Sequence, residues 1–442
     1  MPAFPASASE SPVRAAETLL RWPRAVPLAA LVSGGEERAH NGWSIFARPC
    51  ETVVIDGGLS PAEAVARLEA ALARTPRERE GTGMCGPVGA SRTPPFQGGW
   101  IVALGYGLGA CLEPDALPRH SASPAPHAVL LWCEDAWCLD HSDGSLHAVG
   151  APPELEAVPR ALPWRLERFG PDTSDSHYAA AVEQVVEFIR AGDAFQANIA
   201  RRFSAGFSGD PRTFAHHAIA ENRAWFGASL EFGDAGHVVS ISPELFLRVG
   251  PDGTVVTRPI KGTRPSSVDR AELEESAKDA AELAMIVDLM RNDLGRVAET
   301  GSVRVTSARV FETHRTVHHG VAEIAARLRA GVSWLDLLRA TFPPGSVTGA
   351  PKIRAMQIID ELEPHARGFY CGAIGFISKT GHAGLNVAIR TALLDPPASD
   401  GRQCLSYFAG CGIVADSDPA SEVAETHAKT RAIAQLATPG CA

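Results

Sequence analysis

Two pairs of carboxylates stand out among the residues whose types and spacing could do chemistry. Asp279 and Glu282 are three residues apart, as are Glu422 and Glu425, and Lys429 follows four residues later. On a helix, spacings of three and four put side chains on one face. Such a pair is most often a solvated face with a salt bridge. If both faces meet inside the protein, burying these carboxylates requires a cation. Mg²⁺ fits, because it binds one or two carboxylates and keeps its other positions for water and an anionic substrate.

A lysine in a stiff backbone setting is the second candidate. Lys261 ends a β-rich run inside Arg258–Pro265, a stretch with two prolines and a glycine that restrict the chain direction. A nucleophilic lysine must lose its proton, so burial or nearby cations must lower its pKa from about 10.4. Arg258 and Arg264 could supply those cations. A lone lysine is more often a surface charge, and both interpretations stay open on residue type alone.

Further residues could act on an anionic substrate. Glu244 begins a strand among apolar residues, so it is a candidate general acid with a raised pKa, or equally a strand-edge charge. Tyr370, Arg390 and the turn at 409–412 could hold carboxylates. Arginine binds a carboxylate through two parallel hydrogen bonds, and glycines let backbone N–H groups approach an anion.

Three motifs resemble nucleotide or zinc sites but fail on spacing. The glycines at 105–109 lack the last spacing of a dinucleotide loop, and the segment 345–352 has GxxxG with a proline before its lysine. His314, His318 and His319 give HxxxH without the glutamate of a zinc protease. The sequence therefore predicts neither a nucleotide site nor a zinc site.

The elements that must position these residues alternate between helices and paired strands. Helices are predicted at 61–72 (with Ser60 as N-cap), 178–190, 272–294, 334–338, 352–362 and 422–436. Strands are predicted at 53–55, 238–241, 245–249, 254–257, 376–378, 385–391 and 405–408. Because strands come in neighbouring pairs rather than strict alternation with helices, the pattern favours a largely antiparallel α+β fold.

The chain divides into two halves. Residues 1–15, rich in Pro, Ala and Ser, are predicted to be disordered. An N-terminal half is expected over 16–160 and a catalytic domain over 175–437, with a Pro-rich boundary between them. The stretches 81–99 and 113–127, which contain Pro, Gly and Ser, are predicted to be surface loops.

Composition excludes several classes of protein. The 442 residues are 45% hydrophobic and carry a formal net charge of −10, which allows a sizeable core and argues against nucleic acid as a partner. No apolar run reaches the roughly eighteen residues of a membrane helix, and the N-terminus lacks the pattern of a secretory signal. Nine scattered cysteines are typical of reduced thiols in a cytoplasmic protein.

Together these segments resemble the chorismate-utilising enzymes. The similarity lies in GDAFQANIARRF (192–203), PIKGTRP (259–265), SAKDAAELAMIVDLMRNDLGRV (276–297), FPPGSVTGAPKIRAMQIIDELEP (342–364), RGFYCGAIGFIS (367–378) and AGCGIVADSDPASEVAETHAK (409–429). The first 150 residues match only through LVSGG (31–35), NGWSIFARP (41–49) and GGWIVALGYGLG (98–109). The implied fold is α+β, with two intertwined halves, large mostly antiparallel sheets facing each other, and helices outside.

The resemblance implies an amino transfer to chorismate that forms 4-amino-4-deoxychorismate. Glu282 and Glu425, supported by Asp279 and Glu422, would bind the Mg²⁺ that holds the ring carboxylate. Glu244 would be the general acid for the leaving hydroxyl. Lys261 would attack ring carbon 2 and expel the hydroxyl at carbon 4, after which ammonia adds at carbon 4 and releases the lysine.

The resemblance also implies a substrate-binding set. Its members would be Gln196, Gly262, Thr263, His319, Thr348, Tyr370, Arg390, Gly410, Gly412 and Lys429. Gln196 occupies the position of a water-activating lysine in isochorismate-forming members, which counts against that activity. The chain departs from the family pattern at Leu283, Gly320, Pro344 and Cys411, and none of these changes removes a proposed chemical group.

The partners implied are chorismate, ammonia and a separate glutamine amidotransferase subunit, with a separate lyase acting on the product. A glutaminase needs a nucleophilic cysteine with histidine and glutamate partners. The segment around Cys85 resembles such a cysteine turn only weakly, and no His-x-Glu follows it. One alternative is an anthranilate-forming member, although such members carry alanine where this chain has Lys261. Another is a non-catalytic regulator that binds chorismate or tryptophan. Relatives often hold a tryptophan pocket in the N-terminal half, and only the fragment around Ser33 resembles it.

Overall fold

The computed structural model describes residues 11–34, 42–76, 93–116, 125–313 and 317–437. Predictions for Cys85, for His314 and for most of the loop at 81–99 lie outside these residues. Part of the segment predicted to be disordered is a helix, α1 (Ser11–Arg21). Its apolar residues Ala15 and Leu19 are fully buried, and the helix packs on α5 (Pro211–Asn222). The composition of the N-terminus hid this helical spacing.

The described strands form one connected antiparallel network. They are β1 (Ala29–Val32), β2 (Trp43–Ile55), β3 (Gly99–Leu104), β4 (Ala128–Asp140), β5 (Leu146–Val149), β6 (Trp164–Leu166), β7 (Gly170–Pro171), β8 (Gln196–Gly209), β9 (Phe226–Glu231), β10 (His237–Ser242), β11 (Leu245–Val249), β12 (Thr254–Arg258), β13 (Ile260–Pro265), β14 (Arg304–Thr313), β15 (Val317–Arg327), β16 (Gly349–Ala350), β17 (Ala373–Ser378), β18 (Ala383–Val387), β19 (Thr391–Leu394) and β20 (Gln403–Ile413). This fold class agrees with the prediction from the sequence.

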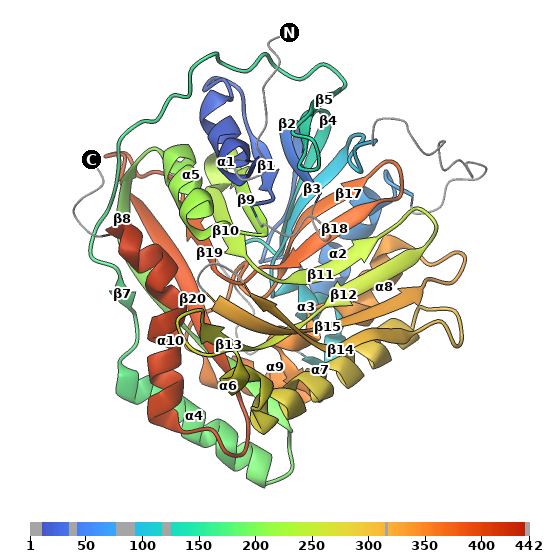
Figure 1. Cartoon of the computed structure of the whole chain (residues 1–442), viewed down its shortest axis with the longest axis vertical. Helices are drawn as coiled ribbons and strands as arrows, with labels where there is room; N and C mark the ends of the chain where they lie inside the picture. The colour runs from blue at the N-terminus through green and yellow to red at the C-terminus, as the bar shows by residue number, and fades with distance from the viewer. Residues whose placement is uncertain (1–10, 35–41, 77–92, 117–124, 314–316, 438–442) are drawn as a thin grey trace.

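The order of the strands shows how the two halves intertwine. Hydrogen-bonded neighbours run β14, β15, β12, β11, β18, β17, β3, β4, β2, β1, β9, β10, β19, β20 and β8. The N-terminal strands β1 to β4 therefore lie in the middle, with C-terminal strands on both sides (Figure 1). We call β11 to β15, β17 and β18 the first wing, and β8 to β10, β19 and β20 the second wing.

The chain crosses between the wings at two points. It passes from β10 in the second wing to β11 in the first through 243–244, and from β18 back to β19 through 388–390. The strand predicted over 385–391 is therefore wrong, because the second crossing interrupts it. Both crossings place non-strand backbone, and its side chains, where the wings meet.

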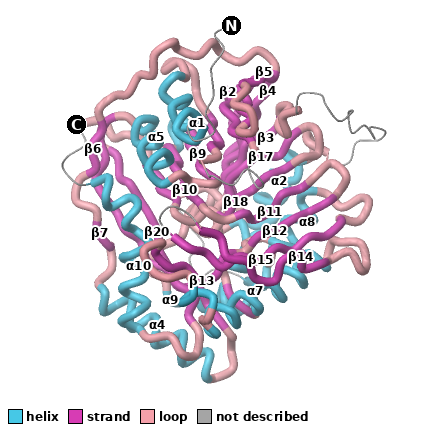
Figure 2. Tube along the Cα trace, viewed as in Figure 1, coloured by secondary structure: helices cyan, strands magenta, loops and turns pink. Residues whose placement is uncertain are grey.

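Ten helices cover the network in the described residues. Besides α1 and α5 they are α2 (Pro61–Leu72), α3 (Leu108–Leu112), α4 (Asp175–Arg190), α6 (Ala271–Glu274), α7 (Ala277–Gly295), α8 (Trp334–Thr341), α9 (Lys352–Leu362) and α10 (Pro419–Ala434). Figure 2 shows α7 beside the first-wing strands β13 to β15, and α4 and α10 on the side of β8 and β20. None of these described helices is both long and apolar enough to cross a membrane.

Local capping explains where several helices begin. Ser60 and Glu63 form a capping box at the start of α2, as its N-cap prediction anticipated. The single helix predicted over 272–294 is wrong: it divides into α6 and α7, because the Ser276 side chain accepts the Asp279 N–H and caps a new helix. Helix α7 therefore begins after this break instead of continuing from α6.

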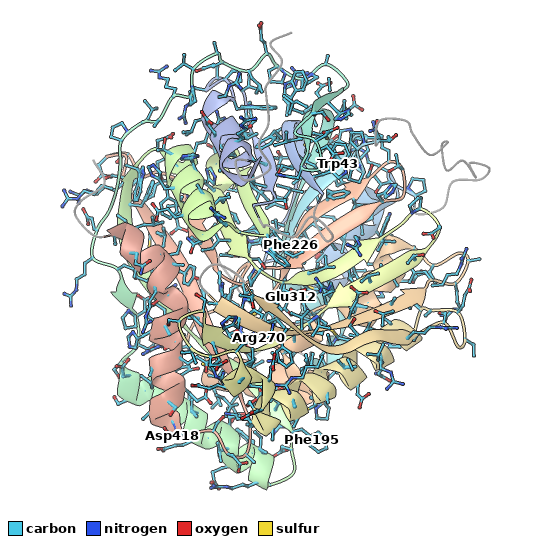
Figure 3. The ribbon with its side chains drawn as sticks, viewed as in Figure 1. Trp43, Phe195, Phe226, Arg270, Glu312 and Asp418 are labelled. Carbon is cyan, nitrogen blue, oxygen red and sulfur yellow. The ribbon has the colours of Figure 1, made fainter. Side chains whose placement is uncertain are left out.

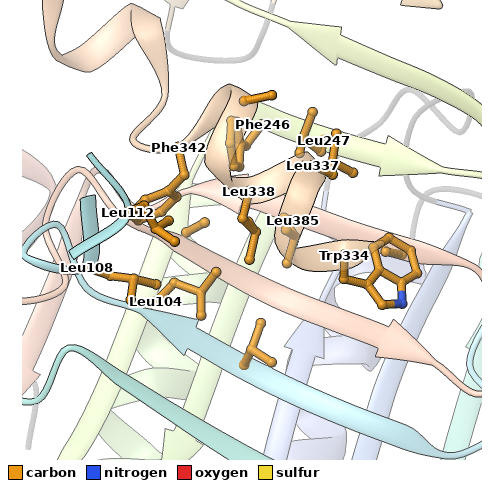
Figure 4. Packing of buried hydrophobic residues seen from close by; sticks show 14 of the residues in the cluster. Leu104, Leu108, Leu112, Phe246, Leu247, Trp334, Leu337, Leu338, Phe342 and Leu385 are labelled. Carbon is orange, nitrogen blue, oxygen red and sulfur yellow. The ribbon is translucent and has the colours of Figure 1, made fainter. Parts of the chain in front are cut away.

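The largest cluster of buried apolar residues lies under the first wing. Trp334, Leu337 and Leu338 of α8 pack with Phe246 and Leu385 from β11 and β18 (Figure 4). Removing this apolar surface from water is the main stabilising contribution. The core thereby holds rigid the strands that enter and leave the two crossings. The described cysteines are free thiols.

Candidate active site

Lys261 lies on a β-bulge. In the pairing of β13 with β15, Ile260 is opposite Val321 and Thr263 is opposite His319, which leaves one extra residue on β13. A bulge breaks the alternation of a strand and re-aims the side chains on it. The lysine side chain therefore does not follow the direction that a regular strand would give it.

Two glycines make this bulge feasible. Gly262 has φ of +80°, and a Cβ there would lie 2.9 Å from Cγ of Asp279. A Cβ at Gly320 on β15 would lie 2.7 Å from the Lys261 carbonyl oxygen. Because only glycine satisfies both demands without displacing backbone, Gly262 and Gly320 hold the lysine in place. The departure at Gly320 noted in the sequence thus has a packing reason.

The lysine amine faces the second wing. A Cβ at Gly412 on β20 would lie 3.3 Å from Nζ of Lys261, so these two strands approach each other across the site. Burial lowers the pKa of Lys261; Glu282 and Glu244 oppose this effect, and the Lys429 cation adds to it. The net pKa is below that of an ordinary lysine, which favours the neutral, nucleophilic amine.

The two arginines expected to supply this cation are paired elsewhere. Arg258 lies 2.5 Å from Glu312 and 3.2 Å from Glu323. Arg264 lies 2.8 Å from Asp279. Their charge is balanced by these carboxylates, and the lowered pKa of Lys261 comes mainly from burial, with Lys429 as the contributing cation.

Glu244 lies in the first crossing between the wings. Its backbone is fixed by the Val387 N–H, which donates to its carbonyl at 3.0 Å, and by its own N–H, which donates to the Ser242 hydroxyl at 3.2 Å. The residue is 3% exposed, and burial raises the pKa of its carboxyl to about 7 although Ser346 and Lys261 lower it. Oε1 has no hydrogen-bond partner among the described residues. A carboxyl that keeps its proton near neutral pH can act as a general acid.

Arg390 lies in the second crossing. Its φ is +51°, an uncommon conformation for a residue with a side chain, and its carbonyl accepts the Ile241 N–H at 3.0 Å. Burial lowers the pKa of its guanidinium, against the opposing effects of Tyr407 and Glu244. No salt bridge to Arg390 occurs within the part of the chain that the structure describes. A cation placed this way is suited to bind an anionic ligand.

The carboxylates come from one helix of each wing. Glu282 extends from α7, and Glu422 and Glu425 from α10, where their oxygens and the Cys411 sulfur lie within 4.8 Å of one another. Burial raises the pKa of Glu282; Lys261 and Lys278 lower it, and Asp279 and Glu422 raise it. Glu282 and Glu422 repel one another, and their hard oxygen donors fit a divalent cation such as Mg²⁺, whereas Glu425 is exposed and pairs with Lys429.

Asp279 has a different environment from the other predicted carboxylates. Its side chain pairs with Arg264 at 2.8 Å and lies against Gly262. It therefore supports the bulge and places negative charge behind Glu282. A role for Asp279 in metal binding stays a prediction.

Lys429 connects α10 to residues 409–412, for which the predicted turn is wrong, because they pair with β8 inside strand β20. Its amine donates to the Gly410 carbonyl at 2.6 Å and lies 2.7 Å from Glu425. Burial would lower the pKa of Lys429, but Cys411 and Glu425 raise it more strongly, so the lysine stays charged. Lys429 therefore places a fixed positive charge beside Lys261 and Glu425.

The remaining predicted residues surround these groups. The Thr263 hydroxyl and Nδ1 of His319 are 2.8 Å apart. Thr348 is fully buried, and its hydroxyl donates within its own turn. The ring of Tyr370 stacks on Phe408 with centroids 5.4 Å apart. These contacts give Thr348 and Tyr370 a structural role, and their role in substrate binding stays a prediction.

Sequence reasoning missed two polar residues of the site. Ser346 lies beside Glu244 and belongs to the segment rejected as a phosphate loop. Asn198 lies two residues after Gln196 on β8, so the strand period puts both on one face. That spacing was the signal that could have identified Asn198.

A separate cavity of about 340 Å³ lies between β1, β9, β11, β17 and β18. Ser33, Trp43, Phe226, Arg248 and Asn386 are among the residues lining it. Figure 3 labels Trp43 and Phe226, which come from the N-terminal half and the second wing. The fragment around Ser33 that resembles a tryptophan pocket thus lies at this cavity.

The chain is similar to known proteins. Residues 31–435 match the family model described as chorismate binding enzyme. The chain is 40% identical over 355 residues to aminodeoxychorismate synthase component 1 of Klebsiella aerogenes, with 77% of each chain covered. It is 35% identical over 378 residues to anthranilate synthase component 1 of Streptomyces coelicolor strain A3(2), covering 77% of this chain and 73% of the relative.

A solved structure shows the same architecture. Anthranilate synthase component I from Streptococcus pneumoniae TIGR4 superposes with a TM-score of 0.73 and 30% identity, over 89% of this chain and 92% of that chain. The match of the family model spans both wings and both crossings. The chain therefore belongs to the chorismate binding enzyme family.

Proposed function

We propose that this chain converts chorismate and ammonia to 4-amino-4-deoxychorismate. One observation carries the proposal: a lysine with a lowered pKa, Lys261, is held by a bulge toward the centre of the site. Relatives named aminodeoxychorismate synthase component 1 at about 40% identity support the same reaction.

The proposed reaction proceeds in two additions. The neutral amine of Lys261 attacks ring carbon 2, the ring double bond shifts, and the bond between carbon 4 and its hydroxyl breaks. Glu244 donates its proton to the departing hydroxyl, which leaves as water. Ammonia then adds at carbon 4, the double bond shifts back, and the bond from carbon 2 to Lys261 breaks. The Glu244 carboxylate takes up the proton that the new amine releases.

Charge at the site is matched to a dicarboxylate substrate. Arg390 and Lys429 supply fixed positive charge at the crossing and on α10. Glu282, Glu422 and Glu425 would hold Mg²⁺, with Asp279 behind them. Bound there, the metal would neutralise a substrate carboxylate and hold it against the carboxylates of the protein.

The ammonia requires a source. We propose a separate glutamine amidotransferase subunit, because relatives are named as component 1 of a synthase. We propose that a separate lyase would then act on the product to form 4-aminobenzoate. Glutamine-dependent turnover by the isolated chain would contradict the proposal that a separate subunit supplies the ammonia.

The test is product analysis with purified protein, chorismate, Mg²⁺ and ammonium salt. Appearance of 4-amino-4-deoxychorismate, converted by added lyase to 4-aminobenzoate, is the expected result. Fluorescent anthranilate would instead favour the activity named for other relatives. Binding of chorismate without any turnover would favour a regulatory protein.

A further inference from the structure

Two buried amide side chains lie side by side on β8. Gln196 is 1% exposed and Asn198 is 6% exposed. Oε1 of Gln196 and Nδ2 of Asn198 are buried without a hydrogen-bond partner in the described parts of the chain. A buried amide that makes no hydrogen bond is destabilising, so each such group in a folded protein calls for an explanation.

The strand geometry directs both amides toward the reacting lysine. Asn198 lies directly opposite Gly412 in the pairing of β8 with β20, and Gln196 follows the same face. A Cβ at Gly412 would lie 2.0 Å from Nε2 of Gln196 and 3.3 Å from Nζ of Lys261. The face of β8 that carries the amides is therefore the one that lines the site.

The opposite face of β8 carries the apolar residues that packing in the core requires. Ala197 and Ile199 alternate with the two amides and pack into an apolar cluster with α4 and α9. An apolar residue in place of Asn198 would fill similar space without an unsatisfied donor. Packing by itself therefore gives no reason for an amide at this position.

We infer that Asn198 is a substrate-binding residue that acts together with Gln196. One amide offers a free donor and the other a free acceptor, so the pair suits a small neutral group that both donates and accepts a hydrogen bond. Two participants in the proposed reaction have that chemistry: the ring hydroxyl that departs and the ammonia that arrives. The inference rests on the proposed function and adds to it a polar subsite beside Lys261.

Asn198→Leu tests the subsite, with two measurements that separate its two ligands. Chorismate affinity is measured by calorimetry with Mg²⁺ in a Lys261→Ala background, where the covalent step is blocked. The KM for ammonium is measured in the otherwise unchanged enzyme. Binding of the ring hydroxyl predicts about a tenfold weaker chorismate affinity, with little change in the ammonium KM. Binding of ammonia predicts about a tenfold higher ammonium KM, with little change in chorismate affinity.

Thermal stability separates binding from a structural role. Asn198→Leu removes an unsatisfied buried amide, so its melting temperature should equal or exceed that of the unmodified chain. Asn222→Leu is the control for an asparagine outside the site, because Asn222 is exposed at the end of α5 and donates to the Ala218 carbonyl. If Asn198→Leu does not fold, Asn198→Ala replaces it.

The inference is overturned if chorismate affinity, ammonium KM and turnover all stay within about twofold of the parent enzyme, or if the only effect is a lower melting temperature. Failure of the proposed function looks different. In that case the unmodified chain forms another product, whereas the affinity comparison in the Lys261→Ala background needs no product and stays interpretable.

Discussion

Replacing Glu244 by glutamine should change how the stability of the protein depends on pH. The carboxyl is buried, and its pKa rises from an ordinary 4.5 to about 7. The folded state therefore binds this proton more tightly than the unfolded state does. The resulting stabilisation is fully present below pH 4.5 and is lost as the pH rises through 7, a total of about 3 kcal/mol.

The magnitude can be measured by urea unfolding, followed by tryptophan fluorescence at constant ionic strength. Between pH 5 and pH 8 the unmodified chain should lose roughly 2.5 kcal/mol from this one group. Glu244→Gln keeps the shape and lacks the titrating proton, so its loss over the same range should be smaller by that amount. Glu183→Gln, on the exposed face of α4, is the matched control and should follow the unmodified chain.

Parallel stability curves for the unmodified chain and Glu244→Gln would refute the reasoning. They would mean that the carboxyl ionises in the folded protein as easily as in the unfolded one. The same group predicts kinetics: kcat/KM should fall on the alkaline side as Glu244 loses its proton, and Glu244→Gln should lose most turnover because an amide cannot serve as the acid.

Four further perturbations follow from the site. Lys261→Ala should reduce formation of the 4-amino product by at least on the order of a hundredfold, measured by chromatography with circular dichroism as a check on folding. Glu282→Gln should raise the Mg²⁺ concentration for half-maximal activity by roughly tenfold or more, and an unchanged Mg²⁺ titration would remove this residue from the metal site. Gly412→Ala should abolish turnover, because its Cβ would occupy space next to the amine of Lys261; crystallography would show the displaced neighbours. Lys352→Met should lower the free energy of unfolding by about 3 kcal/mol, because it leaves Asp293, 2.6 Å from the lysine amine, buried and unpaired; denaturant unfolding measures this loss.

Local signals in the sequence predicted many elements correctly. The predictions for α2 and α9 have the bounds that the structure shows, and β11 is also as predicted. Their apolar periodicity, the Ser60 cap of α2 and the neighbouring prolines act within a few residues, so no distant contact was needed to decide them. The long helix over 272–294 failed because Ser276 starts a new helix while its neighbours keep the same pattern.

Long-range pairing decided what the sequence could not show. The strand predicted over 385–391 ends at Val387, because the chain leaves the first wing there and β19 pairs in the second. A period-2 pattern gives no information about which strand will be the partner. The extra residue opposite β15 that redirects Lys261 is likewise a property of two strands together.

The sequence by itself determined which chemical groups are available: the carboxylates on two helix faces, a lysine among prolines and glycines, an arginine and a general acid. Tertiary structure decided how far these groups are buried and therefore their pKa values. The crossings bury Glu244 and half-bury Arg390 where the wings meet, and the approach of β20 to β13 leaves Lys261 only partly exposed to water. A pKa depends on desolvation and on charges brought near from distant segments, and these exist only once the chain has folded.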